Sequence, residues 1–303
     1  MRNRASPKRA LVTGASGFIG SNLVRYMENQ GWDVHILVRA GSNLTGLGDV
    51  ILRITVHHHD GSSAGMAEIM AAARPDIVFH LASLFLSNHK TEDIEALVSS
   101  NLLFSTQILE AMVMSGVKYL VNTGTSWQHY HSEDYRPVNL YAATKQALEC
   151  ILTYYIDAHS LKATTLLLFD TYGPGDPREK LIPLLWKVAT SKQPLKMSPG
   201  QQLIELVYID DVVRAFVMAA EALVNTQTTT HTRYGVSANE PIRLVDLVKE
   251  FELVINDTLP IEFGRRPYRQ REVMKPWSSS HRVPGWSPET PLKEGIVNSR
   301  PPM

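Results

Sequence analysis

Residues 9–20 read RALVTGASGFIG, an apolar run that leads directly into three spaced glycines. The run at 9–13 predicts a buried strand, and residues 18–29, which follow the glycine turn, predict a helix. A strand, a glycine-rich turn and a helix in this order open a βαβ unit. This stretch therefore predicts a parallel sheet that helices cover.

The first half of the chain repeats this alternation. The other runs expected to form strands are apolar on both faces, as in a covered parallel sheet; they are residues 33–38, 51–56, 76–81, 117–122 and 163–169. The expected helices are residues 18–29, 65–73, 92–115 and 140–159. The fold class is therefore α/β, a doubly wound parallel sheet of the Rossmann type.

The glycines have separate tasks in such a turn. Gly14 permits the tight turn, Gly17 lets the backbone approach a pyrophosphate, and Gly20 lets helix and strand pack closely. The N-terminus of the helix offers free N–H groups and the positive end of its dipole to phosphates. A dinucleotide site is predicted here, formed by Gly14, Ser16, Gly17, Phe18, Ile19 and Gly20.

The end of the second predicted strand indicates which dinucleotide binds. A carboxylate there would bind the adenosine ribose 2′-hydroxyl, but this chain has Val38-Arg39. Arg39 can pair with a 2′-phosphate, which favours NADP(H); NAD(H) is the alternative if Arg39 is only a solvated loop cation. Asp60, after the third predicted strand, can bind the adenine amino group or cap the turn before Gly61.

After residue 169 the alternation ends. A turn-rich loop at 172–177, an apolar stretch at 181–188 and a loop at 193–200 precede a strand at 206–209 and a helix at 210–224 with Asp210 as its N-cap. A polar, Thr-rich linker at 225–232 and a helix at 241–255 follow. We expect a dinucleotide-binding Rossmann domain at 1–170 and a smaller substrate-binding C-terminal lobe at 171–303, with 206–224 returning to the first domain.

The composition narrows the class of protein. The 303 residues are 44% hydrophobic, and 30 Lys+Arg balance 30 Asp+Glu, so no charge excess indicates a nucleic-acid or membrane partner. One cysteine, Cys150, cannot form an intrachain disulfide, which indicates a reducing, cytoplasmic setting. No apolar run approaches the ~18 residues of a membrane span. The consecutive His57, His58 and His59 point to opposite faces of a strand, so no metal site is expected.

Tyr141 and Lys145 lie four residues apart in the strongest helical stretch, and therefore on one helix face. Free tyrosine titrates near pH ~10, and a neighbouring ammonium stabilises the phenolate. The phenol then becomes a better proton donor or acceptor near neutrality, which suits a carbonyl that accepts a hydride. Without the dinucleotide loop, Tyr141 and Lys145 would be interpreted as two neighbouring residues on the surface of a helix, a common arrangement without catalytic meaning.

An ordered set of motifs resembles the extended short-chain dehydrogenases/reductases, the group of nucleotide-sugar epimerases, dehydratases and 4-ketoreductases. The motifs span nearly the whole chain; they are residues 13–20, 76–83 (DIVFHLAS), Asn101, 122–126 (NTGTS), Tyr141 with Lys145, 172–174 (YGP) and 207–213 (VYIDDVV). Within the group, YGPGD, KLIP, VYIDDVV and IEFG…REVM look most like the reductases of the CDP-abequose and paratose synthase type.

The resemblance implies roles for individual residues. Tyr141 would be the catalytic acid/base, and Lys145 would hold the nicotinamide ribose and lower the tyrosine pKa. Thr125 would bind the substrate oxygen, with Ser126 as the alternative. The further cofactor contacts that the resemblance implies are Leu81, Ala82, Ser83 and, as an organiser of the site, Asn101.

Departures from the family pattern bear on the substrate. The dehydratases carry Asp-Glu after the catalytic Thr, where this chain has Ser126-Trp127, so water elimination lacks an obvious catalyst. Asp170 replaces an expected Asn and would repel a diphosphate unless it is screened, and Ile204 replaces an expected Arg. Arg269 is the best-aligned phosphate ligand. The candidate substrate contacts are Ser126, Trp127, Asp170 and Arg269.

The leading hypothesis is NADPH-dependent reduction of a keto-sugar, a nucleotide-linked 4-keto-deoxyhexose of deoxysugar biosynthesis. One alternative is an epimerase that uses the same residues with tightly held NAD; another is a non-catalytic dinucleotide-binding protein, which the presence of Thr125, Tyr141 and Lys145 disfavours.

By the resemblance, residues 92–115 and 140–159 are candidates for a homodimer interface. Cys150 is expected to be a small buried residue, and Trp277 and Trp286 to pack the small lobe.

Overall fold

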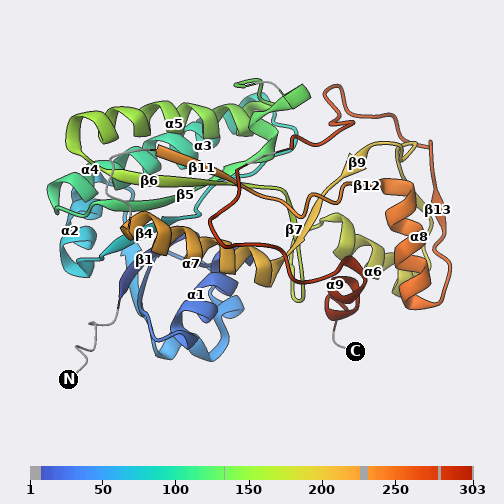
Figure 1. Ribbon diagram of the computed structural model, residues 1–303, viewed down its shortest axis with the longest axis horizontal. Helices are drawn as coiled ribbons and strands as arrows, with labels where there is room; N and C mark the ends of the chain where they lie inside the picture. The colour runs from blue at the N-terminus through green and yellow to red at the C-terminus, as the bar shows by residue number, and fades with distance from the viewer. Residues whose placement is uncertain (1–7, 133, 226–230, 279–280, 302–303) are drawn as a thin grey trace.

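The computed structural model describes residues 8–132, 134–225, 231–278 and 281–301. Its centre is a seven-stranded parallel sheet in the order β11-β6-β5-β4-β1-β2-β3 (Figure 1). The strands are β1 (Arg9–Thr13), β2 (Asp33–Arg39), β3 (Thr55–His59), β4 (Ile77–His80), β5 (Tyr119–Thr125), β6 (Lys162–Leu168) and β11 (His231–Val236). The strand order reverses beside β1, and a ligand crevice opens at such a reversal.

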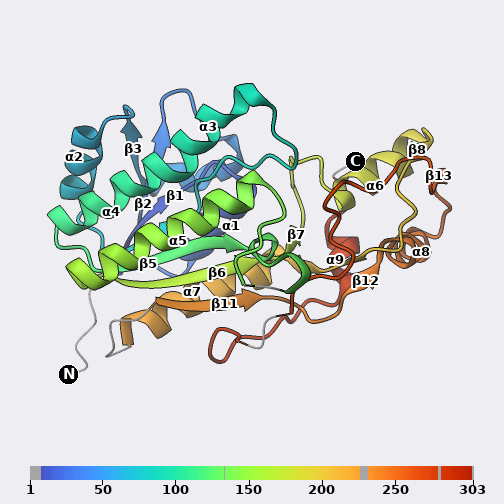
Figure 2. The ribbon, with the colours of Figure 1, turned by 90° about the horizontal axis from the view of Figure 1, so that it is seen from above.

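Helices cover both faces of the sheet, which confirms the predicted fold class (Figure 2). One layer contains α2 (Ser63–Ala73), α3 (Ile94–Val98), α4 (Phe104–Met114) and α5 (Leu140–His159); the other contains α1 (Phe18–Asn29) and α7 (Ile209–Asn225). Leu11 and Val78 of the sheet pack against Met70, Leu109 and Leu152 of the first layer, all fully buried or nearly so. Apolar residues on both strand faces therefore have a partner layer, as the sequence pattern requires.

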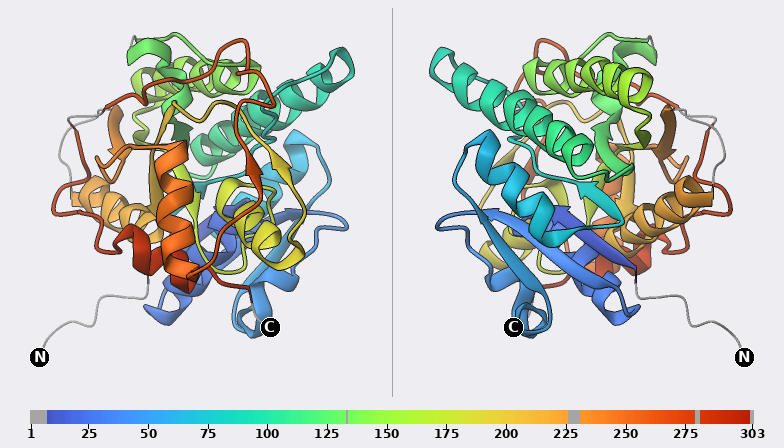
Figure 3. Two further views of the ribbon diagram at one scale, coloured as in Figure 1. Left: turned by 90° about the vertical axis from the view of Figure 1, so that its right-hand side faces the viewer. Right: turned by 90° about the vertical axis from the view of Figure 1, so that its left-hand side faces the viewer.

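A second group of elements lies beyond the carboxyl ends of the strands (Figure 1). Its helices are α6 (Leu181–Ser191), α8 (Leu244–Ile255) and α9 (Leu292–Asn298). Its strands form three pairs, β7 (Asp170–Tyr172) with β10 (Leu206–Tyr208), β9 (Leu203–Ile204) with β12 (Ile242–Arg243), and β8 (Leu195–Lys196) with β13 (Ile261–Glu262). The left view of Figure 3 shows this group in front of the sheet and its helix layers, at the carboxyl ends of the strands.

The chain returns to the sheet in the middle of this group, after β10 and before β12. Helix α7 packs against α1 and over β5 and β6, and β11 extends the sheet beyond β6. The Thr-rich stretch expected to be a linker lies partly outside the described residues, and β11 begins within it, at His231. The division into domains at residues 1–170 and 171–303 stays a prediction.

Several boundaries differ from the sequence prediction. The run at 51–56 is not one strand: the 3₁₀ segment η1 (Thr45–Leu52) buries Leu47 and Val50, and β3 starts only at Thr55. Helix α7 begins at Ile209, so Asp210 lies in its first turn instead of capping it. Cys150 is exposed, not buried. Short apolar runs do not distinguish a strand from a 3₁₀ turn, because both place a few apolar residues within a short span.

The remaining short helical segments lie in two connections, from β4 to α4 and from β5 to α5. They are η2 (Thr91–Asp93), the π-helical η3 (Ser99–Leu103), η4 (Ser126–Gln128) and η5 (Tyr130–Ser132). Among the described residues, the helical stretch Thr91–Met114 is the one long and apolar enough to span a membrane, with a mean hydropathy of 1.3 in its most apolar window. Here its α4 part packs against α2 and α5.

Candidate active site

The glycine turn after β1 has the shape that the sequence predicts. Gly14 has φ +74°, and a Cβ on it would lie 2.6 Å from the backbone nitrogen of Ala82. Gly17 is the N-cap of α1 and donates its N–H to the Gly14 carbonyl at 3.0 Å. Neither glycine therefore puts a side chain between the N-terminus of α1 and the adjacent cavity, which both of them line.

That cavity, of about 720 Å³, lies along the carboxyl ends of β1, β2 and β4. Of the predicted cofactor residues it is lined by Gly14, Ser16, Gly17, Arg39, Asp60, Leu81, Ala82 and Ser83. Phe18 is buried beneath the Arg178 guanidinium, whose Cζ lies 4.7 Å from the ring centroid, and Gly20 packs against the turn itself. The cavity and its glycine cradle fit an extended dinucleotide.

Two residues of this cavity bear on the adenosine end. Arg39 is the exposed last residue of β2. The Asp60 carboxylate already accepts hydrogen bonds from the backbone N–H and the hydroxyl of Ser62, each at 2.8 Å, and these bonds lower the pKa of Asp60. Asp60 therefore caps the turn before Gly61, which was the second of its two expected roles. It also lines the cavity.

A smaller cavity of about 210 Å³ adjoins the first and brings together Thr125, Tyr141 and Lys145. Thr125 ends β5, and the other two lie in the first turns of α5. The Asn139 side chain caps α5 by accepting the Ala142 N–H at 2.9 Å. Ile19, Ser83, Ser126 and Trp127 line the same cavity.

Burial dominates the electrostatics of the Tyr141–Lys145 pair. It raises the pKa of Tyr141 to about 12, although a hydrogen bond with Ser83 lowers it. It lowers the pKa of Lys145 to about 8, while the charge of Glu149 raises it. The Lys145 ammonium lies 6.0 Å from the Tyr141 ring centroid. The net shift of the tyrosine is thus upward, opposite to the expected effect of Lys145, because the buried phenolate loses its hydration.

Asn101 holds the loop after β4 against α5. Its Oδ1 accepts from the Leu84 N–H at 2.7 Å and from the Ser83 hydroxyl at 3.2 Å, and its Nδ2 donates to Thr144 Oγ1 at 2.9 Å. Since Ser83 in turn contacts Tyr141, Asn101 organises the site without lining either cavity.

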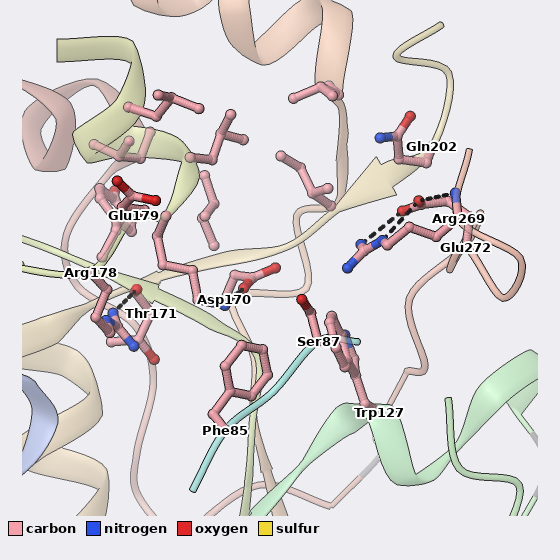
Figure 4. Close-up of a pocket in the computed structure, with 18 residues that line it drawn as sticks. Phe85, Ser87, Trp127, Asp170, Thr171, Arg178, Glu179, Gln202, Arg269 and Glu272 are labelled. Carbon is pink, nitrogen blue, oxygen red and sulfur yellow. Dashed lines mark hydrogen bonds and ion pairs between the residues drawn. The ribbon is translucent and has the colours of Figure 1, made fainter. Parts of the chain in front are cut away.

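A third cavity, of about 470 Å³, lies between β7, the start of α6 and the segment that follows β13 (Figure 4). Of the candidate substrate contacts, Trp127, Asp170 and Arg269 line it, whereas Ser126 lines two neighbouring cavities; their role in substrate binding stays a prediction. In Figure 4, Arg269 and Glu272 lie on one side of Asp170 and Arg178 on the other. Asp170, Trp127, Phe85 and Lys180 border both this outer cavity and the catalytic one.

The cations of the outer cavity all have carboxylate partners. Arg269 donates two hydrogen bonds to Glu272, both at 3.1 Å, and its Cζ lies 5.3 Å above the Trp127 ring. Lys180 pairs with Asp170, and Arg178 pairs with Asp176 through two bonds of 2.7 Å. Sequence reasoning gave no role to Lys180, Arg178 or Glu272. Lys180 begins the KLIP motif and Glu272 lies in REVM, whereas Arg178 had only its position after the YGPGD turn as a signal.

Known proteins resemble this chain along most of its length. The sequence model described as "NAD dependent epimerase/dehydratase family" matches residues 10–233. A CDP-abequose synthase of Yersinia pseudotuberculosis is 26% identical over 271 residues, which cover 88% of this chain and 91% of that protein. The UDP-glucose 4-epimerase of Mycolicibacterium smegmatis is also 26% identical, over 96% of this chain and 97% of its own.

Solved structures agree on the fold. The UDP-glucose 4-epimerase of Thermus thermophilus, in complex with NAD, superposes with a TM-score of 0.80 at 23% identity, over 96% of this chain and 97% of that one. The enzyme of the same name from Stenotrophomonas maltophila, with bound NAD and a formylated UDP-arabinopyranose, gives a TM-score of 0.85 at 20% identity, over 97% of each chain. The sheet, its helix layers and the smaller group of elements are therefore one shared architecture.

Proposed function

Because the chain belongs to the NAD dependent epimerase/dehydratase family, and is therefore an enzyme of the extended short-chain dehydrogenase/reductase type, we propose that it reduces a keto-sugar with NADPH. The proposed substrate is a nucleotide-linked 4-keto-deoxyhexose. The observation that carries the proposal is the convergence of Thr125, Tyr141 and Lys145 in one cavity beside the dinucleotide cavity. NADPH, when bound, supplies a hydride to the carbonyl carbon.

The chain supplies the proton and the geometry. Tyr141 is protonated at neutral pH, well below its pKa of about 12, so the phenol can donate to the carbonyl oxygen. Thr125 Oγ1 already accepts the Trp127 N–H at 3.3 Å, which leaves its own proton free to hold that oxygen. The Lys145 ammonium stabilises the phenolate that remains after proton transfer.

The acidic groups of the catalytic cavity argue against elimination of water. Asp170 is the one carboxylate that lines it among the described residues, and Lys180 pairs with it. Ser126 and Trp127, which follow Thr125, cannot act as acid and base. Reduction requires neither, because Tyr141 alone supplies the proton.

NADPH is proposed as the preferred cofactor because Arg39 ends β2 at the rim of the dinucleotide cavity. A guanidinium at that point can pair with a 2′-phosphate. NAD(H) remains the alternative, and the solved epimerases named above contain NAD.

The outer cavity is proposed to hold the nucleotide diphosphate, with Arg269 as its phosphate ligand. A CDP-sugar is the first candidate, since the relatives in Yersinia pseudotuberculosis and Salmonella typhimurium are CDP-abequose synthases, the latter 24% identical over 94% of this chain.

We also propose a cytoplasmic homodimer. Ile94, Val98, Leu103, Met114 and Tyr154 are exposed on α3, η3, α4 and α5, the helices of the expected interface.

Two measurements test the function. A thermal-shift panel of CDP-, dTDP-, UDP- and GDP-sugars with NADPH identifies the nucleotide, because specific binding raises the apparent stability. The absorbance of the reduced nicotinamide is then followed with the matching 4-keto-sugar. Net NADPH consumption supports reduction. Conversion of a sugar without net change in the cofactor would instead identify an epimerase, the function of the relative in Mycolicibacterium smegmatis.

A further inference from the structure

A buried chain of hydrogen bonds links Thr125 to the edge strand of the sheet. Thr125, Ser126, Trp127 and Gln128 form a capping box at the start of η4: the Gln128 side-chain carbonyl accepts the Thr125 N–H at 2.9 Å. Only 1% of Gln128 is exposed. Gly124 makes room for it, because a Cβ there would lie 2.8 Å from Gln128 Oε1.

The other end of the Gln128 amide is held by helix α5. Its Nε2 donates to Glu149 Oε1 at 2.7 Å and to Gln146 Oε1 at 2.9 Å. The second oxygen of Glu149 pairs with the Arg233 guanidinium from β11. Glu149 is 1% exposed, and a buried carboxylate persists only when it is paired and hydrogen-bonded in this way.

The charge of Glu149 determines which way Gln128 faces. A carboxylate can only accept hydrogen bonds, so the NH₂ end of the Gln128 amide must point toward Glu149. The carbonyl end must then point toward the Thr125 N–H. A neutral amide at position 149 could meet Gln128 in either orientation, and one of these would put the NH₂ group against the Thr125 N–H.

We propose that Glu149 is a positioning residue for Thr125, acting through Gln128, and that Arg233 is the counter-ion that keeps it in place. The proposal rests on the function proposed above, in which Thr125 holds the carbonyl oxygen. Glu149 also lies one helical turn beyond Lys145, and its charge raises the pKa of that lysine. The side chain thus supports two catalytic residues from outside the cavity.

The decisive variants are the single substitution Glu149→Gln and a swap variant that combines Glu149→Gln with Gln128→Glu. In the swap variant, the carboxylate now at position 128 can still accept the Thr125 N–H. The amide now at position 149 can donate to that carboxylate and accept from Arg233. The capping box tolerates a carboxylate at its last position. Glu110→Gln is the matched control, because Glu110 loses the same charge on α4 while its contact is Tyr155, away from the cavities.

Hydrogen exchange of the Thr125 amide in the full chain with NADPH tests the proposal without a substrate. Glu149→Gln should accelerate this exchange about tenfold or more, since the acceptor of the amide is no longer fixed. The swap variant should restore the protection, and Glu110→Gln should leave it unchanged. This readout separates failure of the proposal from failure of the keto-sugar assignment.

Turnover on an accepted keto-sugar gives the second readout. Glu149→Gln should lower kcat about 10- to 100-fold with KM and NADPH affinity within about twofold, because Glu149 lines neither the cofactor cavity nor the catalytic cavity and acts only through its neighbours. The groups that face Lys145 are Glu149 and Tyr141 from α5 and His80 from β4, and burial lowers the pKa of His80 to about 3. The fall of kcat at high pH should therefore begin at lower pH in Glu149→Gln, a change that a capping box alone would not cause.

Wild-type protection of Thr125 together with wild-type kcat in Glu149→Gln would overturn the proposal. So would a swap variant that folds but recovers neither quantity. If Glu149→Gln does not fold, the swap variant decides, since it keeps the net charge of the cluster and an acceptor for the Thr125 N–H; its failure to fold also counts against the proposal.

Discussion

The ammonium of Lys180 lies 3.2 Å from the carboxylate of Asp170, and both side chains border the catalytic and the outer cavity. The repulsion that Asp170 would exert on a diphosphate is therefore screened by a cation supplied from the residue before α6. Lys180 also lies 4.6 Å from the centroid of Phe85, whose ring packs edge-on against Tyr141. The charges of Lys180 and Asp170 thus offset each other where the two cavities meet. Substitution of either residue would change the net charge at this point and with it the affinity for a diphosphate.

Asp170→Asn should tighten the binding of a nucleotide diphosphate sugar about 3- to 10-fold, because Lys180 loses its competing partner. Titration calorimetry with the nucleotide from the thermal-shift panel measures the change. Glu179→Gln is the matched control, since Glu179 lines the same cavity without an ion pair to Lys180. Equal gains in both variants would assign the effect to overall charge.

Tyr141→Phe removes one hydroxyl from a buried site, so the fold and NADPH binding should persist. Loss of a positioned acid costs about 10²- to 10⁴-fold in rate. We expect kcat to fall by that factor while NADPH affinity, followed by fluorescence, stays unchanged. Tyr26→Phe, which alters a partly buried tyrosine on α1 that lines none of the three cavities, serves as control. Near wild-type turnover in Tyr141→Phe would refute the proposed mechanism.

Arg39→Ala should weaken NADPH about 10- to 100-fold and leave NADH nearly unchanged, because a charge-assisted bond to the 2′-phosphate is lost. Paired dissociation constants for the two cofactors provide the measurement. Equal losses for both would reassign Arg39 to the structure of the loop after β2.

The pH dependence of kcat should report Lys145. Burial holds its pKa at about 8, well below that of free lysine, and only its ammonium form stabilises the phenolate. Activity should therefore be full below pH 8 and fall as pH rises through about 8. Tyr141, whose pKa is about 12, stays protonated over that range. Lys145→Met should remove most of the activity, and its residual kcat should no longer fall as pH rises through about 8. If the residual kcat still falls over that range, another group causes the pH dependence.

The sequence predicted the structure best where the identity or the spacing of nearby residues determines the local conformation. Gly14 has the positive φ that its turn requires, and helix α5 spans the residues expected from its period, which places Tyr141 and Lys145 on one face. Both are local properties, so spacing along the chain was enough to predict them.

Contacts across the chain could not be predicted in this way. Lys180 screens Asp170 because β7 and the start of α6 lie side by side, and Arg233 reaches Glu149 because β11 adds to the sheet beside β6. The net pKa of Tyr141 depends on how deeply the phenol is buried, which spacing does not reveal. No period or motif in the sequence encodes these three facts.

Strand β11 follows the glycine turn, β5 and α5 in the chain, yet its Arg233 completes the hydrogen-bond chain to Thr125. A ribosome releases the glycine turn, Thr125, Tyr141 and Lys145 long before it releases this arginine. A nascent chain that ends before residue 231 can thus have the cofactor cradle while Glu149 still lacks its counter-ion. The order of synthesis therefore places the supporting charge after the cofactor cradle and the catalytic residues, but before Arg269 and Glu272 of the outer cavity.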